Sequence, residues 1–560
     1  MSTRRLIECV PNISEGRDPK VIAAVTQVVE TVEGVKLLDV DPGAATNRTV
    51  ITFAGEPEAV IEAAVLLVKR AGELIDMRKH SGAHPRFGAT DVCPLVPISG
   101  VTMEETAAYA RELGRRLGEE LGLCVYLYEE AATTPARRNL ADVRAGEYEG
   151  LPARIGTEQW KPDFGPAKFD AQRGATAVGA RDFLVAYNVN LNSTSVKRAN
   201  EIAMAVREKG CVARDAEGNV VRDAQGEKVR VPGTLKQVKG IGWFIEEYGI
   251  AQLSMNLTNI SITAVHTVFD EVQRQADARG LRATGSEIVG LVPLSCLLDA
   301  GRHYLAKQRR STGVSDAELI KIAVKSMGLD DLAPFDPATR VIEYVLEAGA
   351  PARLVDLSVR GFALETASES IAPGGGSVAA AAGALGAALG TMVANLSIEK
   401  KGWEERYEEL DAVAARGKGC LDELLRLVDA DTDAFNGFTA ARRLPKSTPE
   451  EIAARDEAIQ EAIRGAIRVP LRVMEVSVEA LEVAALMAET GLPASASDAG
   501  VGALCARAAV RGAGLNVRIN CPDLADPGER AEFLAAADAL VQRAEELERL
   551  ALAAVDTNLA

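Results

Sequence analysis

The histidines are the first residues to examine for proton-transfer chemistry, because imidazole titrates close to neutral pH. The 560 residues contain only four of them, at positions 80, 84, 266 and 303. His266 lies in an apolar run at the start of an expected helix, where a core histidine with satisfied hydrogen bonds is favoured. His303 lies on another expected helix, where a surface or packing role is favoured.

His80 and His84 share a loop rich in Gly and Pro, between an expected helix and an apolar strand. Rigid folds often carry their chemistry on such loops. Pro85 fixes the backbone after His84, and Arg86 could hold an anion. Catalytic and structural roles weigh equally here. Histidines four residues apart could also bind a metal, but no nearby Cys or Glu completes a ligand set, so no metal site is predicted.

Two further segments of the N-terminal part carry side chains that could take part in catalysis or ligand binding. Asp39 and Asp41 end the second expected strand on one face, where a carboxylate could orient a histidine or, equally, shape a turn. The loop 164–174 is expected to join two α/β blocks. Its Gly and Pro residues, the cations Lys168 and Arg173 and an aromatic ring would suit a flat anionic ligand in a cleft between the blocks. A plain linker is the equal alternative.

In the C-terminal part, Gly374, Gly375 and Gly376 open an Ala-rich helix. Backbone N–H groups at a helix start can hold a carboxylate or phosphate. No Gly-Lys-Ser/Thr follows, so this is not a Walker loop. The alternative, of equal weight, is that the glycines permit tight packing.

Asp431 is the strongest signal for a titrating carboxyl. It continues an apolar helical stripe with 4, 3, 4, 3 spacing, formed by Leu424, Val428, Phe435 and Phe438. Burial would raise its pKa toward the range in which it can give and accept protons. A structural aspartate that caps another helix or pairs with Arg is the alternative. Asp429 and Asp433 fall beside the stripe, and Asp498, Asn516 and Asn520 are weaker signals of the same kind.

The elements that must position these groups form three blocks. Residues 1–180 read as β-α-β-β-α with further helix and strand, which predicts a sheet with a helical layer on one side. Residues 181–335 read similarly, with a polar hairpin excursion near 214–230, so two related α/β subdomains are predicted. Residues 336–359 contain the boundary. Residues 360–560 are predicted to form an all-α bundle, because 46 of the residues 361–560 are Ala. The run 516–519 is the one strand-like stretch in this block.

The amino-acid composition limits the classes of binding partner and the cellular compartment that can be expected. With 63 Lys+Arg against 80 Asp+Glu the net charge is −17, which disfavours nucleic acid and anionic membranes as main partners. Eight cysteines without a C-x-x-C pair indicate reduced thiols, and no signal peptide is recognised, so a cytoplasmic protein is predicted. The uncharged stretch 371–398 is rich in Ala and Gly, with Leu385, Leu389, Met392 and Leu396 on one stripe. It is predicted to be a buried helix of a soluble protein.

Several motifs together resemble the bifunctional formimidoyltransferase-cyclodeaminases. They include Glu-Cys-Val-Pro-Asn-Ile-Ser-Glu-Gly at 8–16, Leu-Leu-Asp-Val-Asp at 37–41, Thr-Asn-Arg-Thr at 46–49, His-Pro-Arg at 84–86 and Lys-Gly-Ile-Gly-Trp at 239–243. Further stretches are 91–94, 145–149 and 163–166, and, in the C-terminal block, 372–380, 427–431 and 444–446. They span nearly the whole chain in the family's order.

The resemblance implies a formiminotransferase with two ferredoxin-like halves, followed by a helical cyclodeaminase domain. The first part would transfer the formimino group of N-formimino-L-glutamate to N5 of tetrahydrofolate, and the second would close 5-formiminotetrahydrofolate to 5,10-methenyltetrahydrofolate and release ammonia. The family's catalytic histidine and aspartate would be His84 and Asp431, with Asp41, Arg86, the three glycines and Asp498 as supporting candidates. The implied folate loop comprises Gly165, Pro166, Ala167, Lys168, Phe169, Asp170, Ala171, Gln172, Arg173 and Gly174.

Tetrahydrofolate, monoglutamylated or polyglutamylated, would be a co-substrate, and neither a metal nor a redox cofactor is expected. The resemblance also implies a homo-oligomer. Two alternatives stay open at this point. The C-terminal block could instead be a methenyltetrahydrofolate cyclohydrolase, or the whole chain could be a non-catalytic folate-binding scaffold.

Overall fold

The computed structural model describes residues 5–44, 46–82, 86–349, 352–370 and 372–559, and it divides into two compact units. The α/β unit comprises Ser2–Ala300 and Ala323–Ala348, and the helical unit comprises Gly301–Ile322 and Gly349–Ala560. Between residues 2 and 560 the chain therefore passes from one unit to the other three times. The segment Gly301–Ile322, inside the predicted second block, groups with the helical unit.

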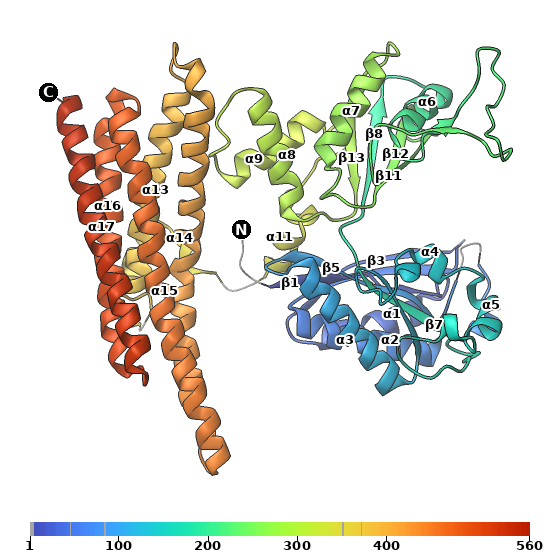
Figure 1. The fold of residues 1–560 in the computed structure, drawn as a ribbon, viewed down its shortest axis with the longest axis horizontal. Helices are drawn as coiled ribbons and strands as arrows, with labels where there is room; N and C mark the ends of the chain where they lie inside the picture. The colour runs from blue at the N-terminus through green and yellow to red at the C-terminus, as the bar shows by residue number, and fades with distance from the viewer. Residues whose placement is uncertain (1–4, 45, 83–85, 350–351, 371, 560) are drawn as a thin grey trace. The chain divides into compact units, whose positions relative to one another are not determined.

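A seven-stranded sheet forms the first part of the α/β unit (Figure 1). Strands β3, β4, β1 and β5 are antiparallel neighbours in this order, and β2 also pairs with β4 and β5. Beyond β5, strands β7 and β6 are added in parallel. The strand bounds are β1 Leu6–Cys9, β2 Asn12–Ile13, β3 Val35–Gly43, β4 Arg48–Gly55, β5 Thr90–Ser99, β6 Cys124–Glu129 and β7 Ala175–Ala180.

Helices cover both faces of this sheet. On β6, Val125 and Leu127 point into a core shared with α1, α2 and α3, whereas Tyr126 and Tyr128 point into a second core with α4 and α5. The helix bounds are α1 Pro19–Thr26, α2 Pro57–Leu74, α3 Met103–Leu121, α4 Leu140–Val143 and α5 Glu147–Arg154. The predicted helical layer is thus present, and short helices cover part of the opposite face.

Strand β7 corrects the predicted position of the loop 164–174. This loop leads into β7, which lies between β5 and β6. Both ends of the loop therefore belong to the first sheet, and the prediction that it joins the two α/β blocks is wrong. The signal was weak because all six residues of β7 are buried, so the strand shows no alternation of polar and apolar residues.

A four-stranded antiparallel sheet forms the second part of the α/β unit, with strand order β11-β12-β8-β13. Along the chain its elements run β8-α6-β11-β12-α7-β13. The first sheet contains the matching series β1-α1-β3-β4-α2-β5 with the matching order β3-β4-β1-β5, which supports the predicted relation between the blocks. The bounds are β8 Val185–Leu191, α6 Val196–Val206, β11 Val238–Ile245, β12 Ile250–Leu257, α7 Val265–Asp277 and β13 Ala283–Val289.

The predicted polar excursion is also present as a long hairpin after α6, which starts with β9 (Cys211–Val212) paired to β10 (Arg230–Val231). Figure 1 shows it extending away from the second sheet. Further along the chain, α11 (Ile342–Glu347) returns to the α/β unit, where Ile342 packs with Ala54 and Val96 of the first sheet.

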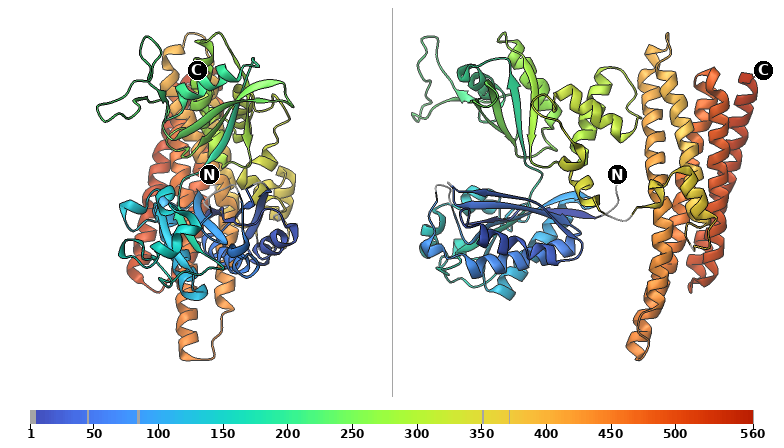
Figure 2. Two further views of the ribbon diagram at one scale, coloured as in Figure 1. Left: turned by 90° about the vertical axis from the view of Figure 1, so that its right-hand side faces the viewer. Right: turned by 180° about the vertical axis from the view of Figure 1, so that it is seen from behind.

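Long helices build the helical unit (Figure 2). They are α13 Gly375–Ile398, α14 Tyr407–Arg442, α15 Pro449–Thr490, α16 Ala496–Asn520 and α17 Pro527–Leu559, preceded by α12 Val359–Thr366. The predicted all-α bundle is confirmed, but the strand-like run 516–519 lies inside α16 and that prediction is wrong. Buried Val510, Ala513 and Val517 follow helical spacing, and this longer pattern outweighs two β-branched residues.

Helix α13 packs through its small residues. A Cβ on Gly386 would lie 2.7 Å from the carbonyl oxygen of Gly502, so glycine permits the close approach of α16. The helix is long and apolar enough to cross a membrane, but 61% of its most apolar window is buried, as in the core helix of a soluble protein. Two residues of its bulky stripe are exposed, Leu385 by 63% and Leu396 by 44%, whereas Leu389 and Met392 are half-buried.

A segment between α8 (Leu294–Lys307) and α9 (Asp316–Met327) packs on α13 and α14. The Ser311 hydroxyl lies 2.6 Å from Oδ1 of Asn395, and the Thr312 N–H donates to Asp411 Oδ1 at 2.6 Å. At Gly313 a Cβ would lie 2.5 Å from the backbone of Ala414, so only glycine fits there. These contacts attach the segment to the helical unit.

Candidate functional sites

A cavity of about 260 Å³ lies in the helical unit, where the start of α13 meets α14, α15 and α16. Its polar side chains come from α14, α16 and the turn that follows α16. The lining residues are Ala372, Gly374, Gly375, Asp431, Thr432, Ala434, Phe435, Phe438, Ile463, Ala466, Asn516, Asn520 and Asp523. The structure thus brings Asp431 and two of the three predicted glycines to one site.

The Asp431 carboxylate lies directly over the first turn of α13. Its Oδ2 accepts hydrogen bonds from the backbone N–H of Ser377 at 3.0 Å and from the Ser377 hydroxyl at 3.3 Å. A Cβ on Gly376 would lie only 2.1 Å from Asp431 Oδ1. The glycines therefore do open a helix that holds a carboxylate, and that carboxylate belongs to the protein itself.

Burial raises the pKa of the Asp431 carboxyl above its ordinary value, and the hydrogen bonds from Ser377 oppose this shift without cancelling it. A carboxyl with a raised pKa holds its proton closer to neutral pH and can deliver it to a leaving group. The two roles weighed for Asp431, a titrating group and a cap of another helix, are thus combined in one residue.

The apolar stripe of α14 leaves the bundle core at Asp431. Leu424 and Val428 are fully buried, whereas Phe435 is 42% exposed and lines the cavity. Asp429, two residues before Asp431, does not line the cavity. It accepts a hydrogen bond from the backbone N–H of Leu354 at 2.7 Å.

Three other polar residues of the cavity have distinct surroundings. The Asn516 amide lies 3.6 Å from the position of a Cβ on Gly375, and Asn520 donates to the carbonyl oxygen of Ala466 at 2.8 Å. The buried hydroxyl of Thr432 has no hydrogen-bond partner among the described residues. Sequence reasoning singled out both asparagines but missed Thr432 and Asp523, which no pattern marks.

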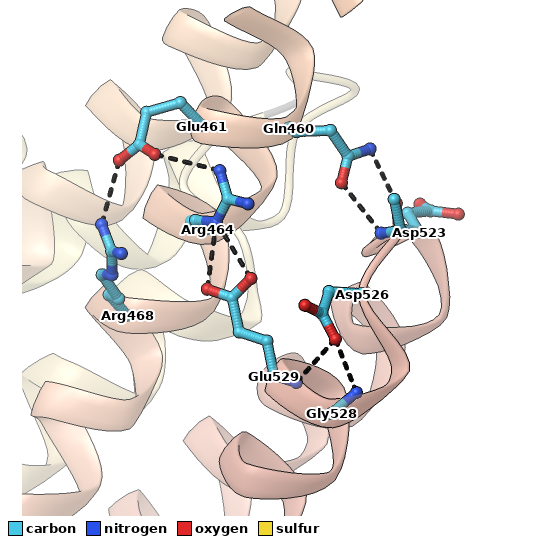
Figure 3. Close-up of polar contacts among 9 residues, drawn as sticks. Gln460, Glu461, Arg464, Arg468, Asp523, Asp526, Gly528 and Glu529 are labelled. Carbon is cyan, nitrogen blue, oxygen red and sulfur yellow. Dashed lines mark hydrogen bonds and ion pairs between the residues drawn. The ribbon is translucent and has the colours of Figure 1, made fainter. Parts of the chain in front are cut away.

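The wall that carries Asp523 is fixed to α15 by polar contacts (Figure 3). The Gln460 side chain donates to the carbonyl oxygen of Asp523 at 3.3 Å and accepts from the N–H of Ala525 at 2.8 Å. Arg464, one turn further along α15, binds both carboxylate oxygens of Glu529 at 3.0 and 3.1 Å. These contacts hold the turn between α16 and α17 in place beside the cavity.

Asp498 is not part of this site. It lies in the first turn of α16, eighteen residues before Asn516. At about 1.5 Å per residue, the two residues are roughly 27 Å apart along the helix.

In the α/β unit, the predicted catalytic residue His84 lies outside the described residues, together with Ala83 and Pro85. The described ends of its loop are well anchored. His80 Nε2 lies 2.8 Å from the carbonyl oxygen of Asn47, and the Asn47 side chain donates to the carbonyl oxygen of Ser81 at 3.0 Å. At the other end Arg86 forms an ion pair with Glu149.

The remaining candidates of this unit have ordinary surroundings. Asp39 and Asp41 are both exposed on β3, so a role for Asp41 in orienting His84 stays a prediction. His266 is half-buried on α7. His303, on α8, is also half-buried but belongs to the segment that groups with the helical unit.

The loop 165–174 is held by polar contacts within itself and with neighbouring segments. Arg173 pairs with Asp170 at 2.7 Å and donates to the carbonyl oxygen of Leu121 at 2.7 Å. Its guanidinium is therefore engaged, and Lys168 is the exposed cation of the loop. Gly165 and Gly174 both have positive φ angles, of 81° and 69°, which favour glycine.

Tyr148 connects the histidine loop and the loop 165–174 of the α/β unit. Its backbone N–H donates to the carbonyl oxygen of Arg86 at 2.8 Å, and its hydroxyl donates to the carbonyl oxygen of Ala171 at 2.5 Å. Its ring lies 5.5 Å from that of Phe169. The structure thus brings the described end of the histidine loop and the loop 165–174 together through a residue that sequence reasoning did not single out.

Next to these loops, two arginines share one buried aspartate. Asp91, whose side chain is 1% exposed, pairs with Arg48 at 2.6 Å and with Arg144 at 3.1 Å. Arg48 also donates to the Asn12 side chain at 2.9 Å. Sequence reasoning assigned no role to these residues, because they come from separate segments. Among the described residues, no group of three or more His, Cys, Asp or Glu side chains is arranged to bind a metal ion.

Three family descriptions match the chain in succession. Residues 6–181 match "Formiminotransferase domain, N-terminal subdomain", residues 186–347 match "Formiminotransferase domain", and residues 358–539 match "Formiminotransferase-cyclodeaminase". The chain is 44% identical over 554 residues to the formimidoyltransferase-cyclodeaminase of Gallus gallus, covering 99% of both proteins. The Mus musculus protein of that name is 43% identical over 93% of both chains.

The chain belongs to the formimidoyltransferase-cyclodeaminase family. Proteins similar to single parts of the chain are found as well. The glutamate formimidoyltransferase of Streptococcus pyogenes is 40% identical and covers 54% of this chain and 93% of its own. A solved formiminotetrahydrofolate cyclodeaminase from Thermotoga maritima is 26% identical with a TM-score of 0.33, and covers 36% of this chain and 98% of its own.

Proposed function

We propose that the chain catalyses two consecutive reactions on folate. It transfers the formimino group of N-formimino-L-glutamate to N5 of tetrahydrofolate, and it then closes 5-formiminotetrahydrofolate to 5,10-methenyltetrahydrofolate with release of ammonia. The observation that carries this proposal is the similarity along 99% of the chain to a formimidoyltransferase-cyclodeaminase. The cavity beside Asp431 supports the second activity, since a carboxyl with raised pKa borders it.

In the first reaction, N5 of tetrahydrofolate attacks the amidine carbon of the donor to form a tetrahedral intermediate. The bond from this carbon to the glutamate nitrogen then breaks. A group must take the proton from N5 and return one to the departing nitrogen. We assign this to His84, because one imidazole can do both, a contribution of roughly 10²–10⁴-fold.

In the second reaction, N10 attacks the carbon of the formimino group, and the terminal nitrogen leaves as ammonia. The departing nitrogen needs protons, and N10 must lose one. We assign both transfers to the Asp431 carboxyl. Its hydrogen bonds from Ser377 fix its position, and burial raises its pKa, so that it can be protonated when the reaction begins.

The test supplies formiminoglutamate and tetrahydrofolate to the purified protein and follows methenyltetrahydrofolate absorbance together with ammonia. Both products should appear in equal amounts. If neither appears while folate still binds, the protein is a folate-binding scaffold and the proposal fails.

A second candidate keeps the transferase and replaces the cyclodeaminase by a cyclohydrolase. It rests on 41% identity over 178 residues to a methenyltetrahydrofolate cyclohydrolase of Methylorubrum extorquens, covering 32% of this chain and 86% of that protein. Ammonia release from purified 5-formiminotetrahydrofolate distinguishes the two, because a cyclohydrolase does not produce ammonia.

Further properties complete the proposal. Each half of the transferase part is ferredoxin-like, folate binds along the loop 165–174, and neither a metal nor a redox cofactor takes part. Exposed leucines on α13 and exposed Val501, Leu504, Leu515 and Ile519 on α16 support association of copies through the helical unit, and hence a homo-oligomer. The protein acts in the cytoplasm on monoglutamylated or polyglutamylated folates.

A further inference from the structure

The cavity beside Asp431 has an acidic lining. Asp431 and Asp523 are its charged residues, and none of the described residues that line it is Lys, Arg or His. The glutamate tail of a folate carries carboxylates, which an acidic site without cations repels. The part of a folate that fits this cavity is therefore the opposite end, the uncharged pterin.

Two aromatic side chains give the cavity an apolar wall. Phe435 and Phe438 follow Asp431 on α14 after four and seven residues, so they continue along the same side of the helix. Phe435 is 42% exposed, although its ring is apolar. A flat ring that contacts these side chains would cover apolar surface that is exposed in the free protein.

Two asparagines of α16 give the cavity fixed hydrogen-bond acceptors. Nδ2 of Asn516 donates to the carbonyl oxygen of Gly512 at 3.1 Å, and Nδ2 of Asn520 donates to that of Ala466 at 2.8 Å. Because a carbonyl oxygen only accepts, these bonds fix the orientation of each amide. Among the described residues neither Oδ1 accepts a hydrogen bond. Each oxygen is thus available to an N–H group of a ligand.

The two asparagines lie at different distances from the reacting carboxyl. The Asn516 amide lies 3.6 Å from the position of a Cβ on Gly375, the residue before Gly376. A Cβ on Gly376 would in turn lie 2.1 Å from Asp431 Oδ1, so Asn516 borders the reacting end of the cavity. Asn520 follows one turn later, about 6 Å further along α16.

This spacing matches the layout of a pterin. N5, which carries the formimino group, belongs to the reduced ring, whereas N3–H and the 2-amino group belong to the pyrimidine ring fused to it. With the formimino group at Asp431, the pyrimidine ring extends along the cavity toward Asn520. The N–H groups of this ring then meet an acceptor, and its flat face meets the aromatic wall.

We propose that Asn520 determines the specificity of the helical unit for the pterin of 5-formiminotetrahydrofolate. Its Oδ1 accepts a hydrogen bond from the 2-amino group, while Phe435 and Phe438 contact the face of the pyrimidine ring. The pterin end of the folate enters the cavity, and the glutamate tail stays outside. The proposal rests on the cyclodeaminase function argued above and assigns the binding mode of its substrate.

The experiment measures ammonia release by the full-length protein from three purified substrates. 5-Formiminotetrahydrofolate is compared with its 2-deamino-2-methyl analogue, in which a methyl group replaces the 2-amino group, and with 5-formiminotetrahydropteroate, which lacks the glutamate tail. The variants are Asn520→Ala and Asn520→Asp. Neither can donate to Ala466, but Asn520→Asp keeps an oxygen that can accept a hydrogen bond from the ligand.

Asn558→Ala is the matched control. Asn558 lies on α17 and donates to the carbonyl oxygen of Ala488 on α15 at 3.0 Å, as Asn520 does to Ala466. It does not line the cavity. The control therefore removes an equivalent bond between helices without changing the proposed pterin site.

In the wild type, the methyl analogue should raise KM about 3- to 12-fold with little change in kcat, the factor expected for one hydrogen bond between uncharged groups. Asn520→Ala should raise KM for 5-formiminotetrahydrofolate by a similar factor and should no longer distinguish the two substrates. Asn520→Asp should still distinguish them, and Asn558→Ala should behave as the wild type. Loss of the glutamate tail should affect the wild type and Asn520→Ala equally.

The proposal is overturned if Asn520→Ala still distinguishes the two substrates, because the residue would then act only through its bond to Ala466. It is also overturned if Asn520→Asp loses this distinction, or if the Asn520→Ala penalty disappears with the substrate that lacks the tail. If Asn520→Ala does not fold, the wild-type comparison decides, since equal KM values for the first two substrates exclude the contact. A wild type that releases no ammonia refutes the proposed cyclodeaminase, whereas an active wild type with an unaffected Asn520→Ala refutes the pterin site alone.

Discussion

Replacing Gly376 by Ala should disable the cyclodeaminase while leaving the transferase intact. Gly376 has no side chain, and the space that a Cβ would take is filled by the Asp431 carboxylate. The new methyl group would lie 2.1 Å from Oδ1, 2.4 Å from Cγ and 2.6 Å from Oδ2. No ordinary contact between such atoms is this short, so either the carboxylate or the first turn of α13 has to move.

The size of the effect follows from these distances. The carboxylate must withdraw by more than 1 Å to reach the 3.4 Å at which ordinary contacts begin. It would then leave the N–H of Ser377, at a cost of about 1–3 kcal/mol in the free energy of unfolding. A displacement of roughly 1 Å of a reacting group can cost about 10²-fold in rate. We therefore expect kcat for ammonia release to fall at least ~100-fold, and Tm to fall by roughly 2–10 °C.

The assay follows ammonia release from supplied 5-formiminotetrahydrofolate and, separately, formimino transfer from formiminoglutamate. Gly419→Ala is the matched control, since Gly419 lies on α14 with no atom within 4 Å of its Cβ position. Asp431→Asn should reproduce the loss of ammonia release and accumulate 5-formiminotetrahydrofolate. Asp429→Asn should do less damage, because Asp429 does not line the cavity.

The reasoning is refuted if folded Gly376→Ala releases ammonia at the wild-type rate. It is also refuted if Asp431→Asn remains active, or if the Asp429 variant is the more sensitive of the two. A Gly419→Ala protein as impaired as Gly376→Ala would show that any added methyl group in this unit is harmful.

Three further predictions concern the α/β unit. His84→Ala should abolish transfer and leave cyclodeamination of supplied 5-formiminotetrahydrofolate nearly intact; equal loss of both activities would contradict the assignment. A chain that ends at residue 348 should fold and transfer the formimino group, whereas one that ends at 335 should be less stable, as thermal unfolding would show, because it lacks the fully buried Ile342. Burial raises the pKa of Glu8 to about 7, so the folded state binds a proton that the unfolded state releases above about 4.5. The stability of this unit should therefore fall as pH rises from about 4.5 to 7, and Glu8→Gln should remove this part of the pH dependence of Tm.

Local patterns predicted the elements well where one face of an element is buried. The helix Pro57–Leu74 is an example, because Pro57 fixes its first turn and apolar residues recur at three-to-four spacing. Strand β7 was missed because both of its faces are buried, which removes the alternation on which the prediction depends.

Contacts between distant segments could not be predicted in the same way. The stripe on α14 indicated that Asp431 faces inward, but its partner Ser377 lies 54 residues earlier, and only the folded bundle brings the two together. The ion pairs of Asp91 join residues 43 and 53 positions away, and no local pattern marks either of them.

The passage of Gly301–Ile322 into the helical unit has a consequence for the order of folding during synthesis. Ser311 contacts Asn395, 84 residues later, and Thr312 contacts Asp411, 99 residues later. At ~5–20 residues per second, a ribosome needs about 5–20 s to produce these partners after Thr312 has been made. All residues of the seven-stranded sheet have been synthesised by that time, but this segment cannot yet form its contacts with α13 and α14. The nascent chain therefore exposes the segment for seconds, and a molecular chaperone that binds it during this interval would protect the assembly of the helical unit.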